Sequence, residues 1–196
     1  MSGPEYDLIV SAGRLFCSAT GLDGPGAVAV RDDRIVDSGP DVSGTAGEEL
    51  DFPDALLVPG FVDMHSHPAP AHWKYGVAAD DEILPRGSTT ILSQGDAGPA
   101  NWDQYLAEII EPSRTRILMA ISPALNGEVG DGPVFASLDD VNVDECVAAI
   151  ERGGRHVWGI AVNTSDAATG DNDPKEVLRR TLTIAERTGR PLLFGA

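Results

Sequence analysis

Basic residues are scarce in this sequence: 14 Lys and Arg stand against 31 Asp and Glu, giving a formal net charge of −17 at pH 7. A surface of this charge repels phosphate backbones, so the composition argues against nucleic-acid binding. Cysteine is scarcer still, because Cys17 and Cys146 are the only two and have no metal-type spacing. We expect both to be small apolar residues in a cytoplasmic protein.

Long apolar runs are also missing. No stretch approaches the roughly 20 apolar residues that cross a bilayer, so we expect no membrane segment. The N-terminus lacks the basic and apolar regions of a secretory signal. The chain has 196 residues, 42% of them hydrophobic, which suits a globular protein with one sizeable core or two small ones.

Residues 1–58 are predicted to form a small all-β sandwich unit. Short apolar runs at 6–10, 27–30 and 34–37 predict strands, and Asp32-Asp33 is placed as the tight turn of a hairpin. Residues 42–49 are small and polar, which favours an exposed loop. No helical periodicity appears in this part of the chain.

Residues 59–196 change to an alternation of strands and helices. Strands are predicted near 87–93, 116–121, 156–162 and 191–194, with helices between them starting after Asn101, Asn142 and Asp173 as N-caps. Together with one more strand near residue 60, this makes about five strands. Such an array fits the first part of a (β/α)8 barrel, or an open doubly wound sheet. In both folds the reactive groups sit at the carboxyl ends of the strands.

The chain is organised around one stretch, Leu56-Leu57-Val58-Pro59-Gly60-Phe61-Val62-Asp63-Met64-His65-Ser66-His67. It is predicted to be a buried strand, and residues two apart on a strand point to the same side. His65 and His67 therefore project together, and two imidazoles can chelate one cation. Two ligands alone do not make a site, so an ordinary polar strand end is an equal alternative at this point.

The β unit, the string Val58 to His67 and the βα array together resemble the amidohydrolase superfamily. Two further stretches, 85–90 and 110–116, resemble its amidohydrolase/deacetylase group. The resemblance implies a metal-dependent hydrolase that cleaves an amide, acetyl or cyclic-amide C–N bond, or an ester, of a small-molecule substrate. It implies that His65 and His67 hold a divalent metal, zinc before manganese or iron, which lowers the pKa of a bound water.

The sequence departs from that family at two positions. The family's bridging lysine on strand 4 falls at Ala161, and its histidine on strand 5 falls at Gly195. Without the bridging lysine, the resemblance implies a centre with a single ion instead of two. The family's catalytic aspartate would lie beyond Ala196. His72, Asp96 and Asn163 are candidate pocket residues, although a loop histidine, a turn-forming aspartate and a weak amide ligand are the ordinary interpretations.

About five strands do not close a barrel. We expect a second chain or a missing C-terminal segment to complete it, within an oligomer or a longer polypeptide. The alternative is a non-catalytic, degenerate relative that lacks a complete metal site. The glycine-rich segment 126–132 after the third strand is interpreted as a mobile loop at the mouth.

Overall fold

A computed structural model describes residues 3–70 and 76–195. The chain divides into two compact units, Met1–Pro59 and Gly60–Ala196. Within the described ranges, no helix is long and apolar enough to cross a membrane.

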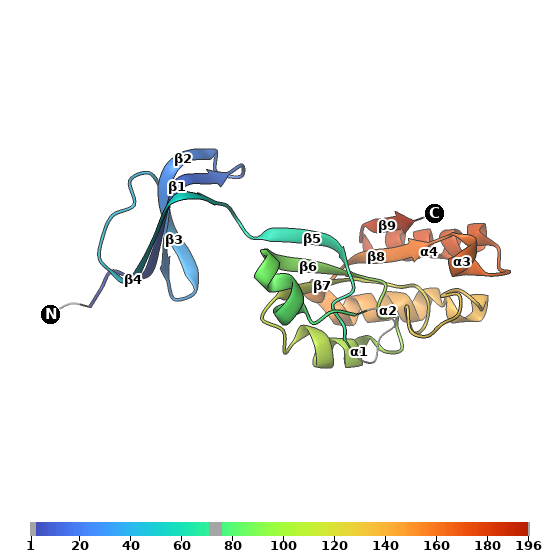
Figure 1. The fold of residues 1–196 in the computed structure, drawn as a ribbon. Coiled ribbons are helices and arrows are strands. Elements are labelled where there is room, and N and C mark those ends of the chain that lie inside the picture. The colour runs from blue at the N-terminus through green and yellow to red at the C-terminus, as the bar shows by residue number, and fades with distance from the viewer. Residues whose placement is uncertain (1–2, 71–75, 196) are drawn as a thin grey trace. The chain divides into compact units, whose positions relative to one another are not determined.

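The first unit is a mixed four-stranded sheet, which confirms the all-β prediction (Figure 1). Its strands are β1 (Tyr6–Cys17), β2 (Leu22–Arg31), β3 (Arg34–Gly39) and β4 (Ala46–Leu57), in the order β3-β2-β1-β4. β1 is antiparallel to β2 and parallel to β4. Asp32 and Asp33 form the predicted hairpin turn with φ of 50° and 60°, a backbone that Asp tolerates better than most residues.

The bounds of β4 differ from the prediction for this unit. Residues 42–49 were predicted to be a loop, yet the strand begins at Ala46 and continues through Pro53. β4 is an edge strand, so Pro53 interrupts no second ladder. Gly13 on β1 faces it, where an added Cβ would lie 1.8 Å from the Pro53 carbonyl oxygen. The close approach of the two backbones therefore requires glycine.

The second unit contains five parallel strands in sequential order. They are β5 (Phe61–Ser66), β6 (Ser88–Gln94), β7 (Arg116–Ile121), β8 (Val157–Asn163) and β9 (Leu192–Gly195). A doubly wound sheet would reverse its order at a switch point, whereas this one runs in one direction. The strands form the predicted half-barrel, and the open-sheet alternative is excluded.

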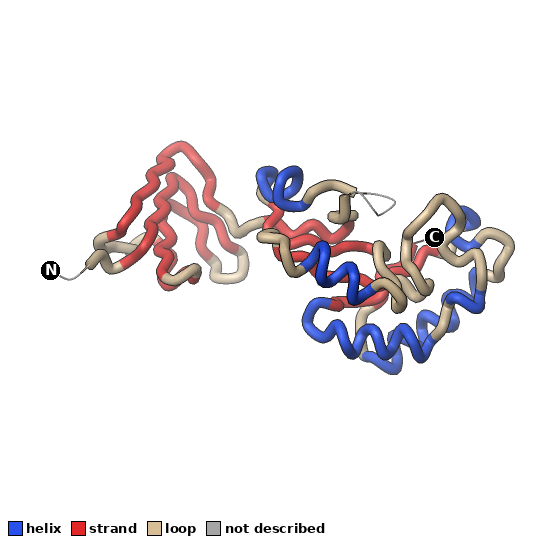
Figure 2. The backbone as a smooth tube through the Cα atoms, turned by 90° about the horizontal axis from the view of Figure 1, so that it is seen from below, coloured by secondary structure: helices blue, strands red, loops and turns tan. Residues whose placement is uncertain are grey.

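Helices cover one face of this sheet (Figures 1 and 2). The α-helices are α1 (Trp102–Tyr105), α2 (Val143–Gly153), α3 (Asp166–Thr169) and α4 (Pro174–Thr188); shorter helical segments span Ala79–Ile83, Leu84–Arg86, Leu106–Ile110, Leu138–Asp140 and Gly154–His156. The main core lies between helices and sheet, and its largest members include Trp102, Tyr105, Ile91, Met119, Ile160 and Ile184. Leu92, Ala120 and Ala161 form a separate cluster, as the alternation of side chains along strands requires.

The predicted caps are confirmed for two helices. Asn142 Oδ1 accepts hydrogen bonds from the N–H groups of Asp144 and Glu145, and Asp173 Oδ1 accepts one from Lys175. Asn101 occupies the predicted N-cap position of α1, but its side chain does not cap the helix. Its side chain accepts from the Gly98 N–H and donates to the Asn126 carbonyl, so it ties two loops together.

The organising stretch is divided between the two units. Leu56 and Leu57 end β4, and β5 begins at Phe61. The strand predicted to be buried is exposed at the edge of the sheet, where Phe61 is 59% exposed, and Phe194 on the opposite edge strand β9 is 54% exposed. In a closed barrel neither strand would be an edge.

Candidate metal centre

His65 and His67 lie at the carboxyl end of β5. Their ring centroids are 5.6 Å apart, with the planes inclined at 67°. The Asp63 carboxylate accepts a hydrogen bond from the His65 backbone N–H at 3.0 Å, which fixes the chain at the strand end. His65 is exposed and His67 is half-buried. The two imidazoles therefore form a pair anchored at the mouth side of the sheet.

Asp96 holds the ring of His67. Its Oδ1 lies 2.6 Å from His67 Nδ1, and its Oδ2 accepts hydrogen bonds from the Ser93 hydroxyl at 2.6 Å and the Tyr105 hydroxyl at 3.3 Å. Ser93 and Tyr105 are also 3.0 Å apart, which closes a buried network. Asp96 is only 1% exposed. A carboxylate accepts hydrogen bonds, so this geometry assigns the proton to His67 Nδ1 and the lone pair to Nε2.

The same network shifts the pKa of His67 and of Tyr105. The hydrogen bond to Asp96 is the main reason that the pKa of His67 is raised, burial opposes it, and the charges of Asp96 and Glu128 add to the rise. Burial, with the nearby Asp96 charge, raises the pKa of Tyr105 well above its ordinary value. Tyr105 is therefore a neutral hydroxyl donor.

A cavity of about 250 Å³ opens beside the two histidines. It is lined from the carboxyl ends of several strands and the loops that follow them, by His65, His67, Gln94, Ser122, Glu128, Val134, Phe135, Ala161, Val162, Asn163 and Gly195. Asn163 Oδ1 accepts a hydrogen bond from the Ser165 N–H, so part of its amide is engaged in a turn. At about 250 Å³ the cavity is slightly smaller than the roughly 300–1,000 Å³ of typical small-molecule sites.

The candidates from the sequence fall into three groups. His65, His67 and Asn163 line the cavity, as do the two departures from the family pattern, Ala161 and Gly195. Asp96 lies behind His67 rather than in the cavity. His72 lies outside the described residues.

Glu128 is a cavity residue that the sequence reasoning missed. It belongs to the loop after β7, which was interpreted only as a mobile segment. Its position in the sequence could have indicated this, because in this fold the loops that follow the carboxyl ends of strands lie at the mouth of the barrel.

The spacing of the two histidine rings fits a zinc ion. Two rings on one tetrahedral zinc, at Zn–N distances of about 2.0–2.1 Å, have centroids roughly 5 Å apart, close to the 5.6 Å observed. Separately from the metal, the buried Gln94 Oε1 in the cavity wall has no hydrogen-bond partner among the described residues, as expected where a bound molecule donates a hydrogen bond. Within residues 3–70 and 76–195, no three His, Cys, Asp or Glu side chains already converge to coordinate an ion.

Known proteins resemble this chain in both sequence and fold. No family model matches the sequence. A deacetylase of Agrobacterium fabrum is 31% identical over 131 residues, which cover 63% of this chain and 31% of the deacetylase. A crystal structure of a dihydroorotase superposes with a TM-score of 0.85 at 23% identity, over 95% of this chain and 50% of that one. The chain thus spans about a third to a half of the length of these relatives.

A zinc-containing structure shares the fold at lower similarity. It is the N-acyl-D-glutamate deacylase of Bordetella bronchiseptica, solved with zinc and a phosphonate inhibitor. The match covers 96% of this chain and 44% of the deacylase, with a TM-score of 0.62 and 14% identity. Relatives in sequence also include a dihydroorotase and an adenine deaminase. The relatives are thus enzymes that hydrolyse C–N bonds, and the two solved structures match the fold of this chain over 50% and 44% of their own length.

Proposed function

Because this chain belongs to the amidohydrolase superfamily, we propose that it carries one side of the active site of a metal-dependent hydrolase. The reaction is hydrolysis of an amide, acetyl or cyclic-amide C–N bond, or an ester, in a small molecule. The observation that carries the proposal is the imidazole pair at the end of β5, with His67 held by the buried Asp96.

The roles of the chain's own residues follow from this geometry. His65 and His67 would hold a single divalent ion, zinc first, through their ring nitrogens, and Asp96 keeps the Nε2 lone pair of His67 available. A bound zinc would lower the pKa of its water and polarise a carbonyl. The orphaned Gln94 Oε1 is placed to accept a hydrogen bond from a molecule in the cavity.

The proposal includes a partner that completes the barrel. β5 and β9 each pair on one side only, and both carry exposed large apolar side chains: Phe61, Val62 and Met64 on β5, and Phe194 on β9. Unpaired strand edges of this kind favour association with further strands. We propose that a second chain or a further segment supplies them, together with the catalytic aspartate. The two free thiols support a cytoplasmic location.

A second candidate function is a non-catalytic relative. It is favoured by Ala161 and Gly195, which line the cavity where the family pattern carries a lysine and a histidine. Neither residue can coordinate a metal. In this case the fold would persist as a structural subunit without a bound ion.

Metal analysis separates the two candidates. The purified protein is assayed for bound zinc, manganese and iron, alone and as the double variant His65→Ala and His67→Ala. His156→Ala is the matched control, because His156 precedes β8 at the opposite end of the sheet. A stoichiometric metal that only the double variant loses supports the hydrolase, which is then tested on N-acetylated amino acids and cyclic amides. A folded protein that binds no metal supports the structural relative.

A further inference from the structure

A hollow of about 560 Å³ lies at the amino ends of β7 and β8. The two strands begin to pair only at Met119 and Val157, whereas β7 itself begins at Arg116. Residues 116–118 therefore have no partner in the described β7–β8 ladder, and the hollow lies beside them. The histidine cavity opens at the carboxyl ends of the strands, so the two sites lie at opposite ends of the parallel sheet. The volume of the hollow falls within the roughly 300–1,000 Å³ of small-molecule sites.

The lining of this hollow is basic, although the chain is acidic. The whole sequence has 31 Asp and Glu against 14 Lys and Arg. Among the described residues that line the hollow there is no acid, and the ionisable side chains are Arg114, Arg116, Arg155 and His156. A cleft lined by charges of one sign attracts ions of the opposite sign. The lining therefore favours an anion.

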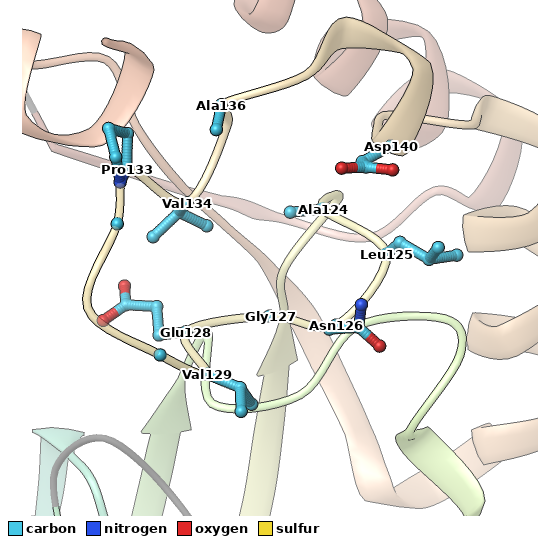
Figure 3. Close-up of a pocket in the computed structure, with 12 residues that line it drawn as sticks. Ala124, Leu125, Asn126, Gly127, Glu128, Val129, Pro133, Val134, Ala136 and Asp140 are labelled. Carbon is cyan, nitrogen blue, oxygen red and sulfur yellow. The ribbon is translucent and has the colours of Figure 1, made fainter.

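Another hollow, in the loops after β7, has the opposite character. It measures about 190 Å³, and Figure 3 shows Glu128 and Asp140 on opposite sides of it. No Lys, Arg or His is among its described lining residues. The basic hollow at the amino ends of the strands is thus a local feature of an otherwise acidic chain.

Two of the three guanidinium groups in the basic hollow have no acid partner within residues 3–70 and 76–195. Neither Arg116 nor Arg155 forms an ion pair with a carboxylate there. Arg114 Nε lies 3.8 Å from Asp80 Oδ2, and its side chain is 76% exposed, so this ion pair contributes little. The Asp80 carboxylate already accepts four hydrogen bonds from residues 113–115. The charges of Arg116 and Arg155 therefore remain available to a ligand.

A neighbouring histidine orients Arg155. The Arg155 Nε–H donates a hydrogen bond of 3.4 Å to His156 Nε2, and both residues belong to the short helical segment Gly154–His156 just before β8. This bond leaves the N–H donors of the two terminal guanidinium nitrogens for a ligand. Such paired donors match the oxygens of carboxylates and phosphates. Arg155 is thus positioned to bind an oxyanion.

The same hollow has an apolar wall. Ile110 ends the helical segment Leu106–Ile110, and Ile117 and Leu118 belong to β7. An inorganic ion could use the arginines but not this wall, because the hydrophobic effect rewards only the burial of apolar surface. A ligand that fits both parts has an anionic oxygen head group and an apolar body.

The strands that we propose to complete the barrel would attach elsewhere. They would pair with β5 and β9, which are the two edges of the sheet. β7 and β8 are inner strands with a neighbour on each side. The position of the hollow therefore favours a small molecule as its occupant.

We propose that this hollow binds a small organic anion, with a phosphate or carboxylate group on Arg116 and Arg155 and an apolar body against Ile117 and Leu118. The site goes beyond the proposed hydrolase function and does not depend on a bound metal.

Phenyl phosphate and benzoate are the probes, since they carry the same phenyl body on two different head groups. Their dissociation constants are measured by isothermal titration calorimetry on the full chain, and the tighter probe identifies the head group. We expect the double variant Arg116→Gln with Arg155→Gln to weaken its binding at least about tenfold, because hydrogen bonds between charged groups are lost. Inorganic phosphate and acetate lack the phenyl body and should bind at least about fivefold more weakly than the corresponding phenyl compound.

The matched control is the double variant Lys175→Gln with Arg179→Gln. It removes two positive charges from exposed side chains of α4 that do not line the hollow. Its affinity for the probe should stay within about twofold of that of the unchanged protein, because salt screens exposed charges outside the site. Thermal melting of each variant verifies that it is folded.

The outcomes decide the proposal independently of the metal site. An equal loss in the two double variants overturns it, because net charge would then explain the binding. It is also overturned if neither probe binds the unchanged chain, or if phosphate and acetate bind as tightly as the phenyl compounds. The His65→Ala and His67→Ala double variant should bind the probe unchanged, and a loss there would place the probe in the histidine cavity instead. Failure of the anion site leaves the proposed hydrolase untouched, since none of these measurements uses a metal.

Discussion

Replacing Asp96 with Asn is the sharpest perturbation of the candidate centre. Asp96 accepts three hydrogen bonds, from His67 Nδ1 and from the hydroxyls of Ser93 and Tyr105. An amide keeps only one acceptor oxygen. If that oxygen turns to the hydroxyls, the NH₂ group faces His67, whose proton must move to Nε2 and block the ligand position.

The expected loss can be bounded. Outer-shell partners of metal-binding histidines typically contribute about 10–100-fold to metal affinity, which corresponds to roughly 1.4–2.7 kcal/mol. We expect Asp96→Asn to fall in this range because the bond to His67 is short and the carboxylate is buried. The fold should also lose stability, since hydrogen bonds to charged groups are each worth about 1.5–3 kcal/mol.

Two measurements check this prediction. Competition titration gives the zinc affinity, and ¹⁵N NMR of the imidazole nitrogens reports which nitrogen of His67 carries the proton. Asp80→Asn is the control, because Asp80 accepts hydrogen bonds from Ser113, Arg114 and Thr115 and does not line the cavity. It should lower stability without changing zinc affinity. Unchanged zinc affinity in a folded Asp96→Asn protein, or an equal loss in both variants, would refute the reasoning.

Three further predictions concern backbone fit, pH and the far side of the cavity. Gly60→Ala should lower the free energy of unfolding by roughly 1–3 kcal/mol, since its Cβ would lie 2.1 Å from Thr89 Oγ1, whereas Gly132→Ala, with open space around it, should be near neutral in the same denaturant titration. The Thr115 hydroxyl and neighbouring N–H groups depress the pKa of Asp80, so its carboxylate stabilises the fold above its ordinary pKa of about 3.9. That stability is lost as pH falls below this value. A plot of the free energy of unfolding against pH should therefore be flatter for Asp80→Asn than for the unchanged protein below that pH, and two parallel plots would contradict this. Gly195→His should tighten zinc binding by about tenfold, because an added Cβ meets Asn163 only at 3.6 Å, and Gly195→Ala should not.

The architecture was predictable because local patterns and the fold agree. The side chains of Asn142 and Asp173 cap their helices by bonding N–H groups only two residues along the chain. A short stretch of sequence is therefore enough to predict these caps. Asn101 has the same residue type and position but bonds across to Asn126, a partner that no local pattern shows. The exposure of β5 also escaped prediction, because an apolar run does not tell a central strand from one at an unpaired edge.

The site was only half predictable for a related reason. The spacing of His65 and His67 placed them together, since alternation along a strand is local. The bond from Asp96 to His67 crosses 29 positions and depends on the turn at Gly95, with its φ of +77°. Glu128 depends on the same turn through a second loop. The placement of both residues arises from tertiary contacts at the strand ends, where the sequence offers only an isolated acid.

The donors of the candidate centre are unevenly distributed, and this determines how many ions we expect. His65 lies near the end of β5 and His67 directly follows the strand, while Asp96 after β6 holds the His67 ring from behind. The side of the cavity formed by β8 and β9 presents Ala161 and Gly195, which provide no ligand atom from a side chain. A second ion would need donors on that side, because we expect the two histidines to hold the first. The expected stoichiometry is therefore one metal per chain, bound at the β5 and β6 side of the mouth.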